Sequence, residues 1–266
     1  MTTTESIGFA LFDAGLLSEP QRQRLGEFAG VVWGYADIPD PQAAAMGPAW
    51  LPLDEPVKAF VAEIWADESR AWAASEGEAS GDFAGLSRHF RALRFTHTHD
   101  DQRYFFRFAD TRCLAAMATA LGRDRYPRLL GPVLRWKYQG RDGRTEVLNN
   151  DPEEAARAQL RLRLRAPELA ALLDASWPDQ LLSSALDADP TLDAGASLKD
   201  RYQWARQLCA ALKEHQVDAY PVQMEAMLVI MRSQGAALSH PKFVEVLVSA
   251  QRQKAPELLS ELSAVV

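Results

Sequence analysis

Residues 103–114, with the sequence RYFFRFADTRCL, change their hydrophobic period partway along, and this change constrains the fold more than any other feature. Tyr104, Phe106 and Phe108 occupy alternate positions, which is typical of a strand with one strongly apolar face. The pattern predicts a strand that leads directly into a helix, with the Asp110 carboxylate as the N-cap that accepts free backbone N–H groups. Beyond Asp110 the apolar residues follow at helical spacing: Leu114, Met117, Ala118 and Leu121.

Arg107 and Arg112 flank Asp110 at this junction. An arginine on a strand that runs into a helix is expected to be partly covered, and a covered guanidinium needs an acceptor. Asp110 is the nearest carboxylate in the sequence. We therefore predict a charge network that is structural in the first place, with direct contact to a binding partner as its second role.

The same junction resembles the core motif of a bacterial domain family, Phe-Arg-Phe-x-Asp-x-Arg-x-Leu, which appears in this chain as FRFADTRCL. The resemblance covers residues 7–140, and beyond them 201–208 and 239–243 are the better local matches. The family commonly has an aromatic residue before the aspartate and a proline after it, where this chain has Ala109 and Thr111. Four other segments resemble the family in the same order: 9–15 (FALFDAG), 47–53 (GPAWLPL), 86–95 (LSRHFRALRF) and 130–138 (LGPVLRWKY).

The family was first catalogued as a domain of unknown function, and its studied members serve as chaperones or adaptors for type VI secretion effectors. The resemblance implies a non-enzymatic chaperone or adaptor that needs no cofactor. Its expected partners are a cognate secreted effector and the spike protein at the tip of the injection apparatus.

Composition narrows the classes of function. The 266 residues carry a formal net charge of −7, which argues against non-specific binding to nucleic acid, because such binding needs a basic surface. No apolar run approaches the length of a membrane span, and the N-terminus MTTTESIG lacks the features of a signal peptide. Two isolated cysteines, Cys113 and Cys209, are expected as small buried residues in a reducing compartment. We therefore expect a cytoplasmic protein that binds neither nucleic acid nor membrane.

The chain is predicted to have two parts, so that its fold class is α+β. Residues 1–165 are expected to form an α/β lobe with a mixed sheet, and residues 166–266 an all-helical lobe. In the second lobe, residues 224–231 (MEAMLVIM) are apolar nearly all round and predict a central buried helix. Three methionines on one face of that helix would also suit contact with a partner helix.

The first lobe alternates strand and helix signals. Capping residues at Ser18 and Asp54 predict two helices, the second with an apolar stripe that includes Trp72. The small, acidic residues 75–85 are typical of a mobile loop. Leucine alternates with arginine over 160–165, which predicts a final strand. Further strands and hairpins are predicted at 9–13, at 50–53, at 91–96 with 103–108, and at 133–138 with 145–148.

Two other classes of function stay open. His97 and His99 have a strand spacing that would let them share a metal, so a small metal-dependent hydrolase is the main alternative, although no third ligand is recognisable nearby. The second open class is a structural subunit of the type VI secretion machine. No nucleophile elbow, phosphate-binding loop or dinucleotide motif is present, so we predict no catalytic residue.

The predicted site is a recess where the two lobes meet, because interfaces between lobes concentrate concave surface. An apolar surface with a polar rim there would capture a segment of the effector and release it when the spike protein competes. We expect Arg107, Phe108, Asp110 and Arg112 to shape this recess or to contact the effector directly.

Overall fold

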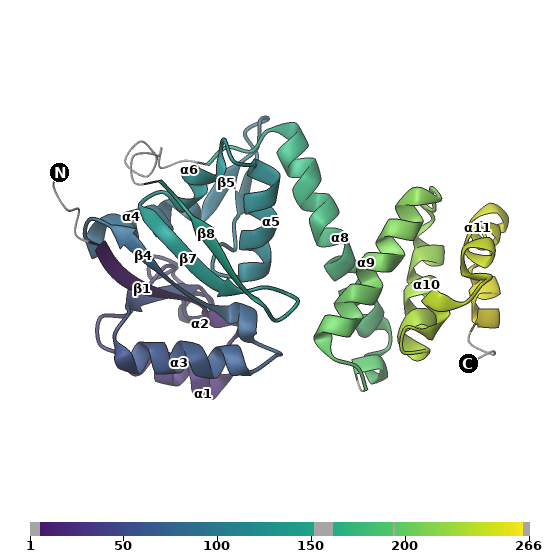
Figure 1. Ribbon diagram of the computed structural model, residues 1–266, viewed down its shortest axis with the longest axis horizontal. Coiled ribbons are helices and arrows are strands. Elements are labelled where there is room, and N and C mark those ends of the chain that lie inside the picture. The colour runs from purple at the N-terminus through teal and green to yellow at the C-terminus, as the bar shows by residue number, and fades with distance from the viewer. Residues whose placement is uncertain (1–5, 152–161, 194, 263–266) are drawn as a thin grey trace. The chain divides into compact units, whose positions relative to one another are not determined.

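The structure is a computed structural model that describes residues 6–151, 162–193 and 195–262 (Figure 1). The chain divides into two units, Met1–Leu172 and Leu173–Val266. All strands of the described residues belong to the first unit, and the second is helical, which confirms the predicted α+β class. Helix α8 (Ala166–Ala188) begins in the first unit and continues into the second.

The main sheet of the first unit has six strands in the order β2-β3-β1-β4-β7-β8. Every ladder between these strands is antiparallel, so the prediction of a mixed sheet was wrong. The strand–helix–strand pattern suggested parallel neighbours. Strands β3 and β4, which flank helix α3, do run the same way, but β1 lies between them. The strands are β1 (Ser6–Asp13), β2 (Val32–Trp33), β3 (Pro48–Pro52), β4 (Ala74–Ser80), β7 (Val133–Gln139) and β8 (Thr145–Asn149).

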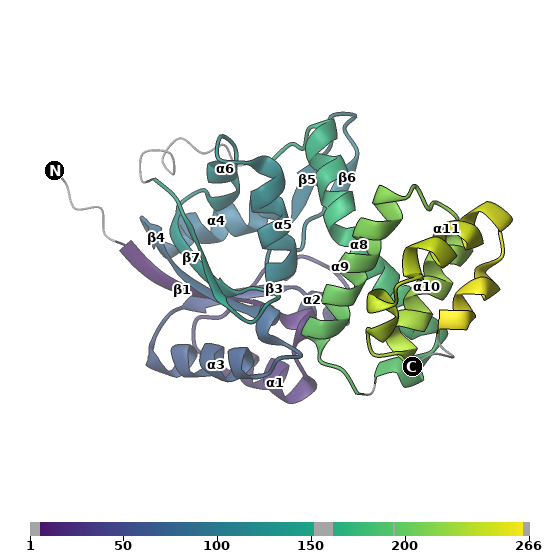
Figure 2. The same cartoon turned by 45° about the vertical axis from the view of Figure 1, so that its right-hand side comes forward.

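Helices cover both faces of this sheet (Figures 1 and 2). Phe9 and Leu11 of β1 pack into one core with helices α4 and α5, whereas Ala10 and Phe12 pack into another with α1 and α3. This division follows from the period of two along a strand, which sends successive side chains to opposite faces. The helices of the unit are α1 (Glu19–Glu27), α2 (Pro41–Ala45), α3 (Glu55–Ala66), α4 (Phe83–Leu93), α5 (Thr111–Leu121) and α6 (Tyr126–Leu130).

Local signals located the first helices correctly. The capping box of Ser18 and Gln21 begins α1, and the Asp54 carboxylate accepts a hydrogen bond from the backbone N–H of Val57 at the start of α3. The apolar stripe of α3 ends with the helix at Ala66. Trp72 therefore lies outside it, in the short 3-10 helix η2 (Ala71–Ala73), and that part of the prediction was wrong.

Phe90 of α4 is the centre of an aromatic cluster against the sheet. Its side chain is fully buried, and its ring centroid lies 5.4 Å from that of Phe9, 5.5 Å from that of Trp50 and 5.6 Å from that of Trp136. The ring of Phe108 stacks on it at 5.5 Å. The cluster therefore connects the sheet with the strand-to-helix junction that the sequence singles out.

The predicted mobile loop at 75–85 is instead the central strand β4 and the start of α4, so this prediction was wrong. Ser75, Gly77 and Ala79 face inward and are buried, while Glu76 and Glu78 alternate with them. The alternation was present in the sequence, but its apolar positions hold only small side chains. They are small because the neighbours leave no room: a Cβ on Gly77 would lie 2.2 Å from the carbonyl oxygen of Arg135.

We expect the substitution Gly77→Ala to lower the free energy of unfolding by about 1–3 kcal/mol, because the new methyl group must displace the adjacent β7 backbone or the Phe9 ring. Chemical denaturation monitored by circular dichroism measures the change. Gly26→Ala is the matched control, since a Cβ there meets nothing within 4 Å. Equal stability of the two variants would contradict the close packing of β4.

Both predicted hairpins are present. Strands β7 and β8 pair on either side of the 140–143 turn. Strands β5 (Phe95–His97) and β6 (Arg103–Phe105) form a separate antiparallel pair, which is shorter than predicted because 91–93 belongs to α4 and Phe106 onwards leaves the strand.

The predicted strand at 160–165 falls partly outside the described residues. Within them, Arg163 makes one isolated parallel bridge with His97 instead of a full strand. Leu162 accepts a hydrogen bond from the His97 N–H, and Leu164 donates one to the His97 carbonyl. This segment therefore occupies one edge of β5.

The second unit has its own core, built by α8, α9 (Leu198–Glu214), α10 (Tyr220–Arg232) and α11 (Phe243–Gln253). Six residues of α10 are buried, including Met227 and Met231, which confirms the predicted central helix. The apolar residues after α11 form the 3-10 helix η5 (Pro256–Leu262) and not an α-helix. Across the described ranges, no helix combines the length and the apolar character that crossing a bilayer requires.

Candidate functional site

At the junction after β6, Asp110 is the N-cap of helix α5 and pairs with Arg112, as the sequence predicts. Asp110 is 2 % exposed and caps α5, with its Oδ1 accepting the backbone N–H of Arg112 at 3.1 Å. The side chain of Arg112 returns to the same carboxylate, with Nε to Oδ1 at 2.8 Å and Nη2 to Oδ2 at 2.7 Å. The guanidinium carbon of Arg112 lies 5.0 Å from the ring centroid of Trp72. Asp110 is thus held by a cap and a bidentate pair together.

Arg107 has a nearer partner than the sequence suggested. Its Nη2 donates to Oδ2 of Asp13 at 2.9 Å, whereas Oδ2 of Asp110 is 3.8 Å away. Asp13 ends strand β1 and is buried, and its Oδ1 also accepts the N–H of Gly15 at 3.1 Å. Sequence reasoning missed Asp13, although a carboxylate that ends an apolar run was a usable signal.

Burial and the neighbouring charges shift the pKa values of Asp13 and Arg107 in opposite directions. Burial raises the pKa of Asp13 above its ordinary value, and the positive charge of Arg107 offsets only part of that rise. For Arg107, burial alone would lower the pKa, but the negative charges of Asp13 and Asp110, together with the hydrogen bond to Asp13 and the nearby Cys113, raise it above its ordinary value. Arg107 is therefore a permanent cation whose side chain remains about half exposed.

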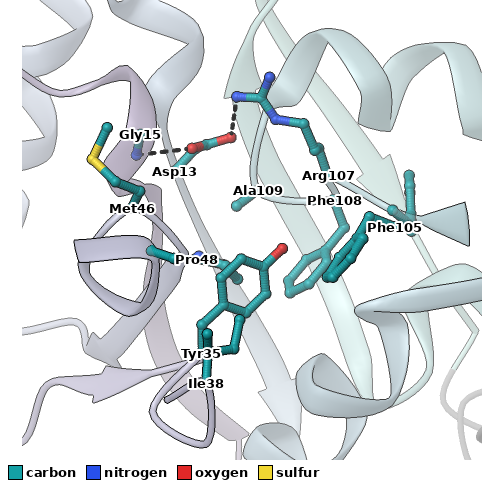
Figure 3. A pocket seen from close by; sticks show the side chains of 12 residues that line it. Asp13, Gly15, Tyr35, Ile38, Met46, Pro48, Phe105, Arg107, Phe108 and Ala109 are labelled. Carbon is teal, nitrogen blue, oxygen red and sulfur yellow. Dashed lines mark hydrogen bonds and ion pairs between the residues drawn. The ribbon is translucent and has the colours of Figure 1, made fainter. Parts of the chain in front are cut away.

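A pocket of about 470 Å³ lies next to this charge pair, entirely within the first unit (Figure 3). Arg107 and Asp13 lie at one side of it, and apolar side chains supply most of the remaining wall. Two of these, Phe105 and Met46, are unusually exposed for large apolar residues, at 60 % and 46 %. The full lining is Asp13, Gly15, Tyr35, Ile38, Ala43, Met46, Pro48, Phe105, Phe106, Arg107, Phe108 and Ala109.

The wall of the pocket that contains Tyr35 comes from a loop fixed by long-range contacts. Arg94 donates to the Gly34 carbonyl at 2.9 Å and forms an ion pair with Asp37. The ring of Tyr35 packs directly on Gly47, where an added Cβ would come within 2.4 Å of it. The same ring meets Phe105 edge-on, with centroids 6.0 Å apart. Nothing in the local sequence of this loop indicated that it would face the junction.

The four predicted site residues therefore separate into two pairs. Arg107 and Phe108 line the pocket, but Phe108 is buried and belongs to its floor. Asp110 and Arg112 are not among the lining residues, and their contacts fix the start of α5. The pocket differs in place from the predicted recess between the two lobes, which stays a prediction.

His97 and His99 do not lie together on one strand, as the metal hypothesis requires. His97 is the last residue of β5 and is half-buried, whereas His99 lies beyond the strand and is exposed. In the part of the chain that the structure describes, no three His, Cys, Asp or Glu side chains come together in a way that could hold a metal ion.

Cys113 lies in the first turn of α5, close to the charge network. Burial raises the pKa of its thiol to about 11, and the negative charge of Asp110 adds to that rise. The thiol is therefore protonated near neutral pH and lacks the thiolate that nucleophilic chemistry needs.

Residues 8–128 match the sequence model of a family described as Domain of unknown function (DUF4123). The matched segment contains all residues that line the pocket and both members of the Asp110–Arg112 pair. No curated protein and no solved structure matches the chain.

Proposed function

We propose that this chain is a non-enzymatic chaperone or adaptor that binds a type VI secretion effector in the cytoplasm and helps to load it onto the spike protein. The proposal combines the family resemblance of the FRFADTRCL junction with one structural observation. That observation is the open pocket beside Arg107, with Phe105 and Met46 exposed at its mouth. Large apolar side chains left in contact with water next to a pocket are typical of protein-binding sites.

The arrangement suits reversible capture. The exposed ring of Phe105 and the thioether of Met46 provide apolar area that a partner can cover, and the half-exposed guanidinium of Arg107 supplies a polar edge. Beneath them, Phe108 is buried and stacks on the aromatic cluster of the core. Such a surface binds without an energy source, and a competing partner can displace what it holds.

The test is co-expression with the protein encoded immediately downstream, followed by size-exclusion chromatography. The proposal predicts a stoichiometric complex, and loss of the downstream protein's solubility when this chain is left out. Separate elution of two soluble proteins would contradict the proposal for that partner. Stoichiometric zinc or manganese in the purified chain, lost in a His97→Ala/His99→Ala double variant, would favour a metal enzyme instead.

The pocket makes a sharper prediction within that complex. We expect Phe105→Ala to weaken the complex by about tenfold or more, because a large exposed ring at the centre of an interface carries a major share of the binding free energy. Isothermal titration calorimetry of the purified partners measures the change. Tyr220→Ala is the matched control, since Tyr220 is a similarly exposed aromatic residue (57 %) in the second unit. Equal affinity of the two variants would place the binding site elsewhere.

A further inference from the structure

Among the residues that the structure describes, one edge of strand β6 has no hydrogen-bonding partner. The N–H of Thr98 donates to the Gln102 carbonyl, and the N–H of Phe106 donates to the Arg94 carbonyl, so every second residue of the β6 segment faces β5. In an antiparallel ladder the alternate residues of the strand direct their N–H and C=O groups away from the partner strand, here away from β5. These residues are Arg103 and Phe105, and within the described residues no hydrogen bond uses their backbone groups.

The opposite edge of the same small sheet is occupied. The outward groups of His97 on β5 bond to Leu162 and Leu164, as the antiparallel register requires. The open side of this sheet is therefore β6. Its three residues are all exposed, and two of them, Tyr104 and Phe105, are aromatic.

The side chains next to this edge indicate which residues an added strand would need at the paired positions. Arg103 and Phe105 lie two residues apart and so share one face of the strand. The Phe105 ring lines the pocket. The Arg103 guanidinium lies over the Phe95 ring, 4.5 Å from its centroid, and the ion pairs of the described residues include none to Arg103. Residues opposite each other on paired strands place their side chains on the same face. A strand added here would therefore present one side chain toward the pocket and another toward Arg103.

We propose that the edge of β6 receives an extended segment of the partner protein as an added strand. This segment has an apolar residue opposite Phe105, which enters the pocket, and an acidic residue two positions away, opposite Arg103. The inference rests on the proposed function and names the kind of segment that the pocket recognises. Backbone hydrogen bonds to Arg103 and Phe105 supply affinity, and the two side chains supply selectivity.

Two substitutions of Arg103 distinguish the contribution of its backbone N–H to binding from that of its side chain. Arg103→Ala removes the charge but keeps the outward N–H, whereas Arg103→Pro removes both, and this N–H takes no part in the ladder with β5. In the complex with the downstream-encoded protein, Arg103→Pro should bind about tenfold more weakly than Arg103→Ala, a difference of about 1.4 kcal/mol.

Amide hydrogen exchange on the unmodified complex gives an independent measurement, which also decides the matter if Arg103→Pro does not fold. The amides of Arg103 and Phe105 should gain protection on binding, while that of Tyr104, which already faces β5, should change little. A complex with no added protection at these two amides overturns the added strand, as does equal binding by the two Arg103 variants, while leaving the adaptor function standing. Failure to form any complex overturns the proposed function itself.

Discussion

Replacing Phe90 with alanine is expected to lower the free energy of unfolding by about 3–5 kcal/mol. The Phe90 side chain is fully buried among Phe9, Trp50, Phe108 and Trp136, with ring centroids 5.4 to 5.6 Å away. Removing it leaves a cavity that those large rings can fill only in part. The loss therefore combines transfer free energy with lost packing contacts.

Urea denaturation followed by tryptophan fluorescence suits this measurement, because Trp50 and Trp136 both lie in the cluster. Phe105→Ala provides the comparison, since the same residue type is removed from an exposed position and should change stability by less than about 1 kcal/mol. If both phenylalanines gave the same loss, the centre of the core would have to lie elsewhere.

Asp110→Ala is expected to lower the free energy of unfolding by about 2–4 kcal/mol. The substitution removes the cap of α5 and also the bidentate partner of Arg112, whose guanidinium is only partly exposed. Arg107 loses its second carboxylate as well, although Asp13 still holds it. Because the segment before Asp110 lines the pocket, we expect partner binding to fall with stability.

Asp110→Asn separates the two contributions, because asparagine is a good N-cap but carries no charge. It should recover the part of the stability that belongs to the cap and leave the loss of the ion pair. Thermal melting and calorimetric binding are measured on both variants. An unchanged melting temperature together with lost binding would make Asp110 a contact residue and would contradict its structural role.

Features that arise from residues close together in the sequence could be predicted, whereas contacts between distant segments could not. The cap at Asp110 was predictable, because the cap, the period change and the flanking arginines lie within a few residues of one another. The hydrogen bond from Arg107 to Asp13 was not, because its partners lie 94 positions apart in the sequence. Tyr35 and Met46 reach the pocket only through the folding of 34–48 against the junction, which no local pattern encodes.

Strand β4 was missed for a different reason. Its inward positions alternate correctly, but they hold serine, glycine and alanine, whose composition is typical of loops. The selection for small side chains comes from the neighbours, above all from the carbonyl of Arg135 beside Gly77. A contact of this kind is visible only once the partner strand is in place.

The pocket joins two kinds of residue with opposite tolerance to mutation. Its floor at Phe108 is part of the aromatic core, whereas its mouth at Met46 and Phe105 contributes little to the folded state because both side chains face solvent. Substitutions of Met46 and Phe105 are therefore expected to have little effect on the stability of the fold. Homologues devoted to different cargo should diverge at those two positions and retain an aromatic ring beneath them.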